Sequence, residues 1–185
     1  MGDKKIFIVG SDNIDKLSLA DTLIEKNDDL SIGSHFTNDK EYKGSVNDNY
    51  IYYLSTQDID LTYKNNFILF INTNNYISEG ITLDTFYNND IFIMSPQDFN
   101  NISGSIFKES YDILIVWLDT NYSKCNDKLN KDIIESRFLE QRLQDEKLKY
   151  IYFFNEENDF ISNVILEYID CDDPERKNQI LLENN

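Results

Sequence analysis

The chain has 185 residues, which suits one domain with a sizeable buried core. Aromatic residues make up 14% of it, far more than a disordered chain carries. The formal net charge is −17, and Lys and Arg do not cluster strongly, which argues against direct binding of DNA or RNA.

The chain opens with a strand, a polar loop and a helix. Residues 4–9 form a short apolar run rich in β-branched side chains, which predicts a buried strand. The loop of residues 10–15 follows it. Residues 16–26 carry apolar side chains at helical spacing and predict an amphipathic helix.

The middle of the chain is less regular. Residues 30–49 hold two glycines and many small polar residues, so we expect mostly loop. Three further strands are predicted at 49–54, 66–71 and 90–94. Helical segments are predicted at 82–87 and from Pro96 through Phe99.

The C-terminal part contains the strongest strand, residues 112–119, which is apolar on both faces and therefore belongs in the middle of a sheet. A charged helix over 131–149 should turn Ile134, Phe138 and Leu139 inward. A last strand follows at 150–154. The last helix, 159–168, should bury five side chains: Phe160, Ile161, Val164, Ile165 and Tyr168.

Strands and helices alternate along the chain, which predicts an α/β fold with parallel βαβ units. We expect three layers, a single parallel sheet with helices on both faces. The strand of residues 112–119 should be central and next to the strand of residues 4–9. One domain should span residues 1–170, and the acidic tail of residues 171–185 should fray.

The cysteines, the single histidine and the absence of a long apolar stretch bear on the cellular compartment of the protein and on its possible metal or membrane binding. Cys125 and Cys171 are far apart without metal-like spacing and read as free thiols in a reducing compartment. The single histidine, His35, reads as a loop or surface residue. No stretch approaches the roughly 18 apolar residues of a membrane helix, so we expect no membrane contact and a cytoplasmic location. The richness in Asn, Ile, Asp, Lys and Tyr suits an AT-rich microbe or a large AT-rich virus. If the source is a virus, the expected location is the host cytoplasm or the virion.

Ligands of open α/β sheets bind at the carboxyl ends of the strands, so the loop after the first strand is the first candidate site. The P-loop pattern is Gly, four variable residues, Gly, Lys, then Ser or Thr. Gly10 and Lys16 fit this pattern, but Asp15 replaces the second glycine and Leu17 replaces the hydroxyl residue. Ser18 stands one place too late.

Beyond this loop the chain resembles the nucleoside and nucleotide kinases, thymidylate kinase especially. Residues 4–26 are similar to that family's opening segment, and residues 112–119 to its central strand. Residues 133–142 look like its lid helix, and residues 150–169 like its closing strand and helix. The segment 30–101 is left unexplained.

The resemblance implies a P-loop kinase-like fold and, if the loop functions, Mg-ATP as cofactor. It implies the following site residues: Gly10, Asp12, Asp15, Lys16 and Ser18 for the phosphates, Ser18 and Asp119 for the metal, and Lys16, Arg137 and Arg142 for catalysis. The family's Asp-Arg-Tyr acceptor motif falls on residues 72–76, Asn-Thr-Asn-Asn-Tyr, which lack both the carboxylate and the arginine.

Each site residue has a structural alternative. Lys16 can be an ordinary lysine at a helix start, and Asp119 can end its strand in a simple turn. Arg137 and Arg142 can pair with acidic neighbours on the helix surface.

The leading hypothesis is a catalytically degenerate kinase-like protein retained for binding a nucleotide, a protein partner or a second copy of itself. An active nucleoside or nucleotide kinase, and a structural protein that uses the fold as a scaffold, are the alternatives.

Overall fold

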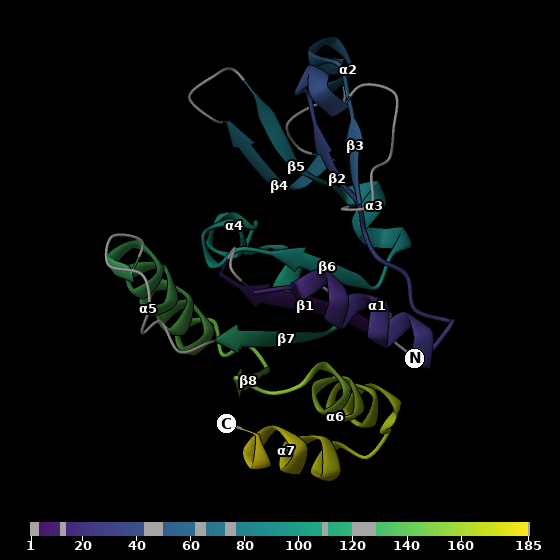
Figure 1. Ribbon diagram of the computed structural model, residues 1–185, viewed down its shortest axis with the longest axis vertical. Coiled ribbons are helices and arrows are strands. Elements are labelled where there is room, and N and C mark those ends of the chain that lie inside the picture. The colour runs from purple at the N-terminus through teal and green to yellow at the C-terminus, as the bar shows by residue number, and fades with distance from the viewer. Residues whose placement is uncertain are drawn as a thin grey trace.

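The computed structural model describes residues 4–11, 14–42, 50–61, 66–72, 77–108, 111–119 and 129–184. Its first sheet has four parallel strands in the order β6-β1-β7-β8. Figure 1 shows α7 at the β8 end of this sheet and a second sheet toward its other end. The strands are β6 (Ile91–Met94), β1 (Lys4–Gly10), β7 (Asp112–Asp119) and β8 (Tyr150–Phe154).

Helices cover both faces of the first sheet, because alternate side chains of its strands point to opposite faces. Ile6 and Ile8 of β1 pack in one core with α1 (Lys16–Lys26) and α6 (Asn158–Asp170). Phe7 and Val9 pack in a second core with α3 (Leu83–Asn88), α4 (Pro96–Asn101) and α5 (Leu129–Asp145). The three-layer α/β prediction and the pairing of β7 with β1 are therefore confirmed.

A second, mixed sheet corrects the prediction of a single parallel sheet. Its order is β3-β2-β5-β4, with β2 parallel to β3 and β5 antiparallel to both β2 and β4. The 30–49 segment, predicted to be mostly loop, supplies its strand β2. The strands are β2 (His35–Thr37), β3 (Ile51–Tyr53), β4 (Phe67–Asn72) and β5 (Ser78–Thr82).

Short elements accompany this second sheet. The helix α2 (Thr56–Leu61) brings buried Ile59 against Phe36 and Phe67 in a small separate core. Two 3₁₀ turns lie at η1 (Lys40–Tyr42) and η3 (Ile106–Lys108).

The tail does not fray, and that prediction is wrong. It forms α7 (Pro174–Glu183), which begins with Asp173 as N-cap, its carboxylate accepting from the N–H of Glu175 at 2.9 Å. Ile180 is buried in the core that also contains α6. The N–H of Tyr152 in edge strand β8 donates to the carbonyl of Asn184, so the tail also covers part of that edge.

Two aromatic side chains predicted to point inward are largely exposed instead. Phe138 is 63% exposed, because α5 buries Leu139 and Leu143, four residues apart on another side of the helix. Phe160 is 49% exposed and meets Phe153 edge to face, with ring centroids 6.2 Å apart.

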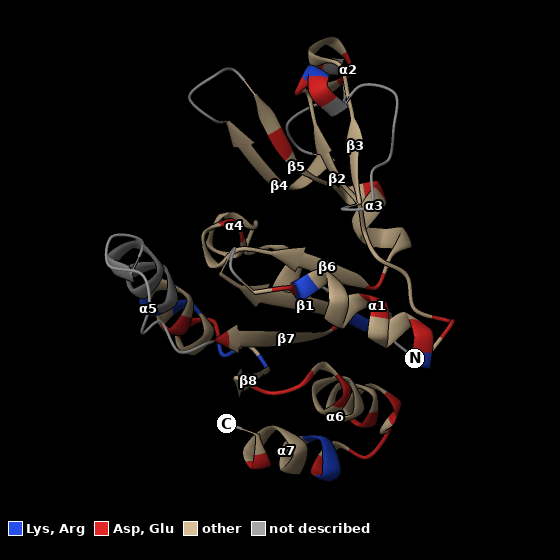
Figure 2. Ribbon diagram, in the orientation of Figure 1, with Lys and Arg blue, Asp and Glu red and all other residues tan. Residues whose placement is uncertain are grey.

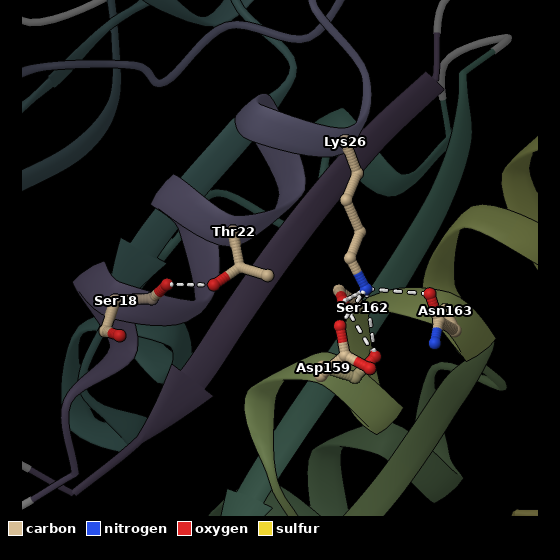
Figure 3. A network of polar contacts seen from close by, with 6 residues as sticks. All are labelled: Ser18, Thr22, Lys26, Asp159, Ser162 and Asn163. Atoms are coloured by element: carbon tan, nitrogen blue, oxygen red, sulfur yellow. Dashed lines mark hydrogen bonds and ion pairs between the residues drawn. The ribbon is translucent and has the colours of Figure 1, made fainter.

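A lysine clamp joins α1 to α6. The ammonium of Lys26 donates to the Asp159 carboxylate at 2.6 Å, the Ser162 hydroxyl at 2.8 Å and the Asn163 side-chain carbonyl at 2.7 Å (Figure 3). On the same helix the hydroxyl of Thr22 donates to the Ser18 carbonyl. The hydrogen bond from Lys26 lowers the pKa of Asp159.

Replacing Lys26 with methionine should reduce the free energy of unfolding at pH 7, and the loss should shrink in acid. A carboxyl with a lowered folded-state pKa stabilises the fold above its unfolded value, about 3.9, and loses that contribution as pH falls through the lower folded value. Urea unfolding of both proteins at pH 7 and about pH 2.5 measures this. In an Asp159→Asn background the effect of Lys26→Met should not vary with pH, and equal pH dependence in both backgrounds would contradict the expectation.

Candidate functional site

The candidate phosphate loop lies between β1 and α1, at the carboxyl end of β1 (Figure 1). Gly10 ends that strand, and a Cβ there would lie 3.1 Å from the Leu118 carbonyl oxygen of the neighbouring strand. The close approach of β7 therefore favours glycine at this position. Asp12, also predicted to bind phosphate, lies outside the described residues.

Asp15, which replaces the second glycine of the P-loop pattern, is the N-cap of α1. Its carboxylate accepts from the N–H of Ser18 at 3.0 Å, so it satisfies one of the otherwise unpaired N–H groups of the first turn. Its φ is −77°, a backbone angle that does not require glycine. A negative charge thus stands at the helix N-terminus, where an anionic ligand would otherwise be attracted.

Lys16 folds back over its own loop. Its ammonium donates to the carbonyl oxygens of Gly10, at 3.0 Å, and Ser11, at 2.7 Å. The residue is 9% exposed. The predicted phosphate-binding lysine therefore holds the loop closed in this structure.

The two predicted metal ligands are engaged with different partners. The hydroxyl of Ser18 accepts from the side-chain amide of Asn158 at 3.0 Å. The carboxylate of Asp119 accepts from the Tyr152 hydroxyl at 3.1 Å. With Leu17 where a hydroxyl residue belongs, these groups do not fit Mg²⁺, and the described residues contain no cluster of three His, Cys, Asp or Glu that could hold a metal.

The two predicted lid arginines have different surroundings. Arg137 lies exposed on α5. Arg142 donates to the backbone carbonyls of Phe99 and Ile102, and its guanidinium lies 5.2 Å from the ring centroids of both Phe99 and Phe107. Arg142 therefore ties α5 to the end of α4.

A cavity of about 570 Å³ joins the loop to the second sheet. Its polar lining comes from Asp15, Lys16 and His35, with Tyr50 beside them. The rest of the wall is mainly aliphatic and includes Ile14, Leu17, Ile32, Ile51 and Ile93.

His35 and Tyr50 were not expected in a site. His35, predicted to be a loop or surface residue, is the first residue of β2, and its N–H donates to the Tyr50 carbonyl at 2.8 Å. Burial lowers the pKa of His35, so the imidazole is neutral at pH 7 even though Asp98 favours its charged form. Tyr50 has a φ of 55°, an uncommon angle for a bulky residue. Neither position carries a sequence signal, because only the pairing of β2 with β3 brings them to the cavity.

Three carboxylates repel one another where the second sheet faces α4: Glu79 of β5, Asp39 after β2 and Asp98 of α4. Burial raises the pKa of Glu79, and the nearby charges of Asp98 and Asp39 raise it further. Only the contribution of Asp98 and Asp39 reflects negative potential, and that contribution does not favour a further anion in this region.

The structure describes only Asn72 of the predicted acceptor motif. Asn72 accepts from the Ser78 hydroxyl at 2.9 Å, and residues 73–76 lie outside the described residues.

Of the two cysteines, Cys171 is a free thiol, and Cys125 also lies outside the described residues. No helix in the described segments is long and apolar enough to span a membrane.

Comparison with known protein families finds no match, and neither does comparison with curated proteins. Among solved structures, the chain is similar to guanylate kinase from Anaplasma phagocytophilum, with a TM-score of 0.55 and 11% sequence identity. The match covers 99% of this chain and 87% of that one. The specific likeness to thymidylate kinase stays a prediction. The chain has the α/β fold of a P-loop nucleotide kinase.

Proposed function

We propose that this protein is a catalytically degenerate member of the P-loop kinase fold, retained for binding rather than phosphoryl transfer. The observation that supports this best is the Asp15 cap. Its carboxylate accepts the Ser18 N–H that could otherwise bind an anion at the start of α1.

The cap acts against a polyphosphate in two ways. It takes up a backbone donor, and it places a like charge beside the cradle. Two like charges about 4 Å apart at an effective dielectric of about 20 repel by about 4 kcal/mol. Lys16, bound to the Gly10 and Ser11 carbonyls, would have to leave both to reach a phosphate.

The cavity beside the loop is the candidate for the retained binding role. Its volume of about 570 Å³ and largely aliphatic wall are typical of small-molecule pockets. An active nucleoside or nucleotide kinase is the second candidate. Lys16 favours it, because the cavity wall includes this lysine beside the loop.

Mg-ATP should bind the wild type weakly or not at all, and the double variant Asp15→Gly, Leu17→Thr should bind it at least roughly tenfold more tightly, or about 1.4 kcal/mol. The first change removes the repelling charge, and the second restores a hydroxyl for Mg²⁺. Glycine is an acceptable N-cap, so the cost to α1 should be only a few tenths of a kcal/mol. Calorimetric titration at equal salt measures the difference.

The single variant Asp15→Asn is the matched control, because asparagine keeps the cap acceptor and removes only the charge. It should give part of the gain. Unchanged binding in all variants would mean that the loop is not a phosphate site. Phosphoryl transfer by the wild type to a nucleoside or nucleoside monophosphate, or Mg²⁺-dependent ATP binding with a Kd on the order of 1 μM, would establish the kinase alternative.

A further inference from the structure

A second hollow of about 540 Å³ lies at the amino ends of strands in the first sheet, whereas the phosphate loop follows the carboxyl end of β1. Asp112 begins β7, Lys149 precedes β8, and Tyr168 belongs to α6. Lys177 and Asn178 of α7 complete its polar wall. Four separate segments thus bring polar side chains to the amino ends of β7 and β8.

Two ammonium groups in this hollow share one carboxylate. Lys149 donates to Asp112 Oδ1 at 2.8 Å, and Lys177 donates to Asp112 Oδ2. Burial alone would raise the pKa of Asp112, but the hydrogen bonds from the two lysines outweigh burial and lower it. The group of three carries a net charge of +1 in a chain of net charge −17, and Figure 2 shows the basic segment of α7 in blue. Each ammonium keeps further N–H donors for another acceptor.

The Tyr168 hydroxyl supplies an independent observation. The residue is 1% exposed, and no group in the described part of the chain accepts its hydroxyl proton, since the neighbouring Lys149 ammonium can only donate to the phenol oxygen. Burial raises the pKa of Tyr168, so the phenol keeps its proton and is a donor at neutral pH. The Lys177 ammonium lies 4.9 Å from the centroid of the same ring. A buried unpaired donor beside two cations is suited to an acceptor that comes from outside the chain.

We propose that this hollow binds a small oxyanion, a phosphate or carboxylate group, through Lys149, Lys177 and the Tyr168 hydroxyl. Asp172 on the exposed rim weakens the attraction, so the Kd for inorganic phosphate should be on the order of 1 mM at low salt. The site is separate from the phosphate loop and does not depend on the function proposed there.

Nuclear magnetic resonance titration of the full chain with phosphate and, separately, acetate tests the site at constant ionic strength. Both anions carry the required oxygens, and the comparison of their affinities distinguishes phosphate from carboxylate ligands. Amide shifts should map to residues 111–112, 149 and 168–178. Tyr168→Phe should weaken binding roughly fivefold, and Lys177→Met roughly tenfold or more.

Lys40→Met is the charge-matched control, since Lys40 is exposed on η1, and it should change the Kd less than about twofold. The Asp15→Gly, Leu17→Thr variant should leave these shifts unchanged, which separates this site from the phosphate loop. The proposal is overturned by the absence of shifts at these residues up to about 20 mM of either anion. It is equally overturned if Tyr168→Phe binds as tightly as the wild type.

Discussion

Alanine at Gly80 is expected to disrupt the second sheet and to lower the free energy of unfolding by about 3 kcal/mol or more. Gly80 lies in β5 and pairs with Phe36 of β2 and Phe70 of β4. A Cβ at this position would stand 2.0 Å from the carbonyl oxygen of Leu69 and 2.9 Å from its carbonyl carbon. These are backbone atoms of the adjacent strand, so a side-chain rotation cannot relieve the overlap.

Gly104→Ala is the matched control. The nearest atom to a Cβ there is Glu146 Oε1 at 3.7 Å, an ordinary contact with a flexible side chain. Alanine should therefore be neutral or stabilise the fold by up to about 1 kcal/mol, because it restricts the unfolded chain. Denaturant unfolding followed by far-ultraviolet circular dichroism compares the two variants. If Gly80→Ala were as stable as Gly104→Ala, the β4–β5 pairing described above would be wrong.

Arg142→Ala is expected to cost about 2–4 kcal/mol of unfolding free energy. The change removes two hydrogen bonds to the carbonyls at the end of α4 and the contacts with the rings of Phe99 and Phe107. The Arg142 side chain is only 12% exposed, so water does not readily replace these partners. Lysine at this position should not restore stability, because one ammonium cannot reproduce the planar fork of the guanidinium.

Arg137→Ala, on the same helix, should change stability by no more than about 0.5 kcal/mol, because this residue is exposed. Urea unfolding and nucleotide titration of both variants separate a structural role from a lid role. If Arg142→Ala weakened nucleotide binding while its unfolding free energy matched that of the wild type, Arg142 would be a phosphate-binding residue and the packing argument would fail.

Several elements could be predicted from local pattern alone. The bounds predicted for α1, β7 and β8 agree with the structure. In β7 a continuous apolar run indicates a strand buried on both faces, and in β8 an apolar run indicates a strand even though Phe154 is 41% exposed at the sheet edge. In α1 the helical spacing of apolar residues defines one buried face. The P-loop-like spacing of Gly10 and Lys16 also located the loop correctly between β1 and α1. The N-cap role of Asp15 could have been anticipated, because aspartate directly before a helix is a common cap.

The sequence by itself therefore determined the α/β class, the parallel first sheet and the departures of its phosphate loop from the P-loop pattern. Tertiary structure decided the second sheet, since β2 has only three residues, His-Phe-Thr, and β5 reads Ser-Glu-Gly-Ile-Thr. A strand of three residues has no readable periodicity, and Ser-Glu-Gly at the start of β5 gives no apolar run, so both strands form because partners distant in the chain supply their hydrogen bonds. Tertiary structure likewise decided that Lys16 closes its own loop, that Arg142 serves packing, and that His35 lines a cavity. In each case the partners of the side chain come from other segments of the chain or from backbone atoms that only the folded chain brings within reach.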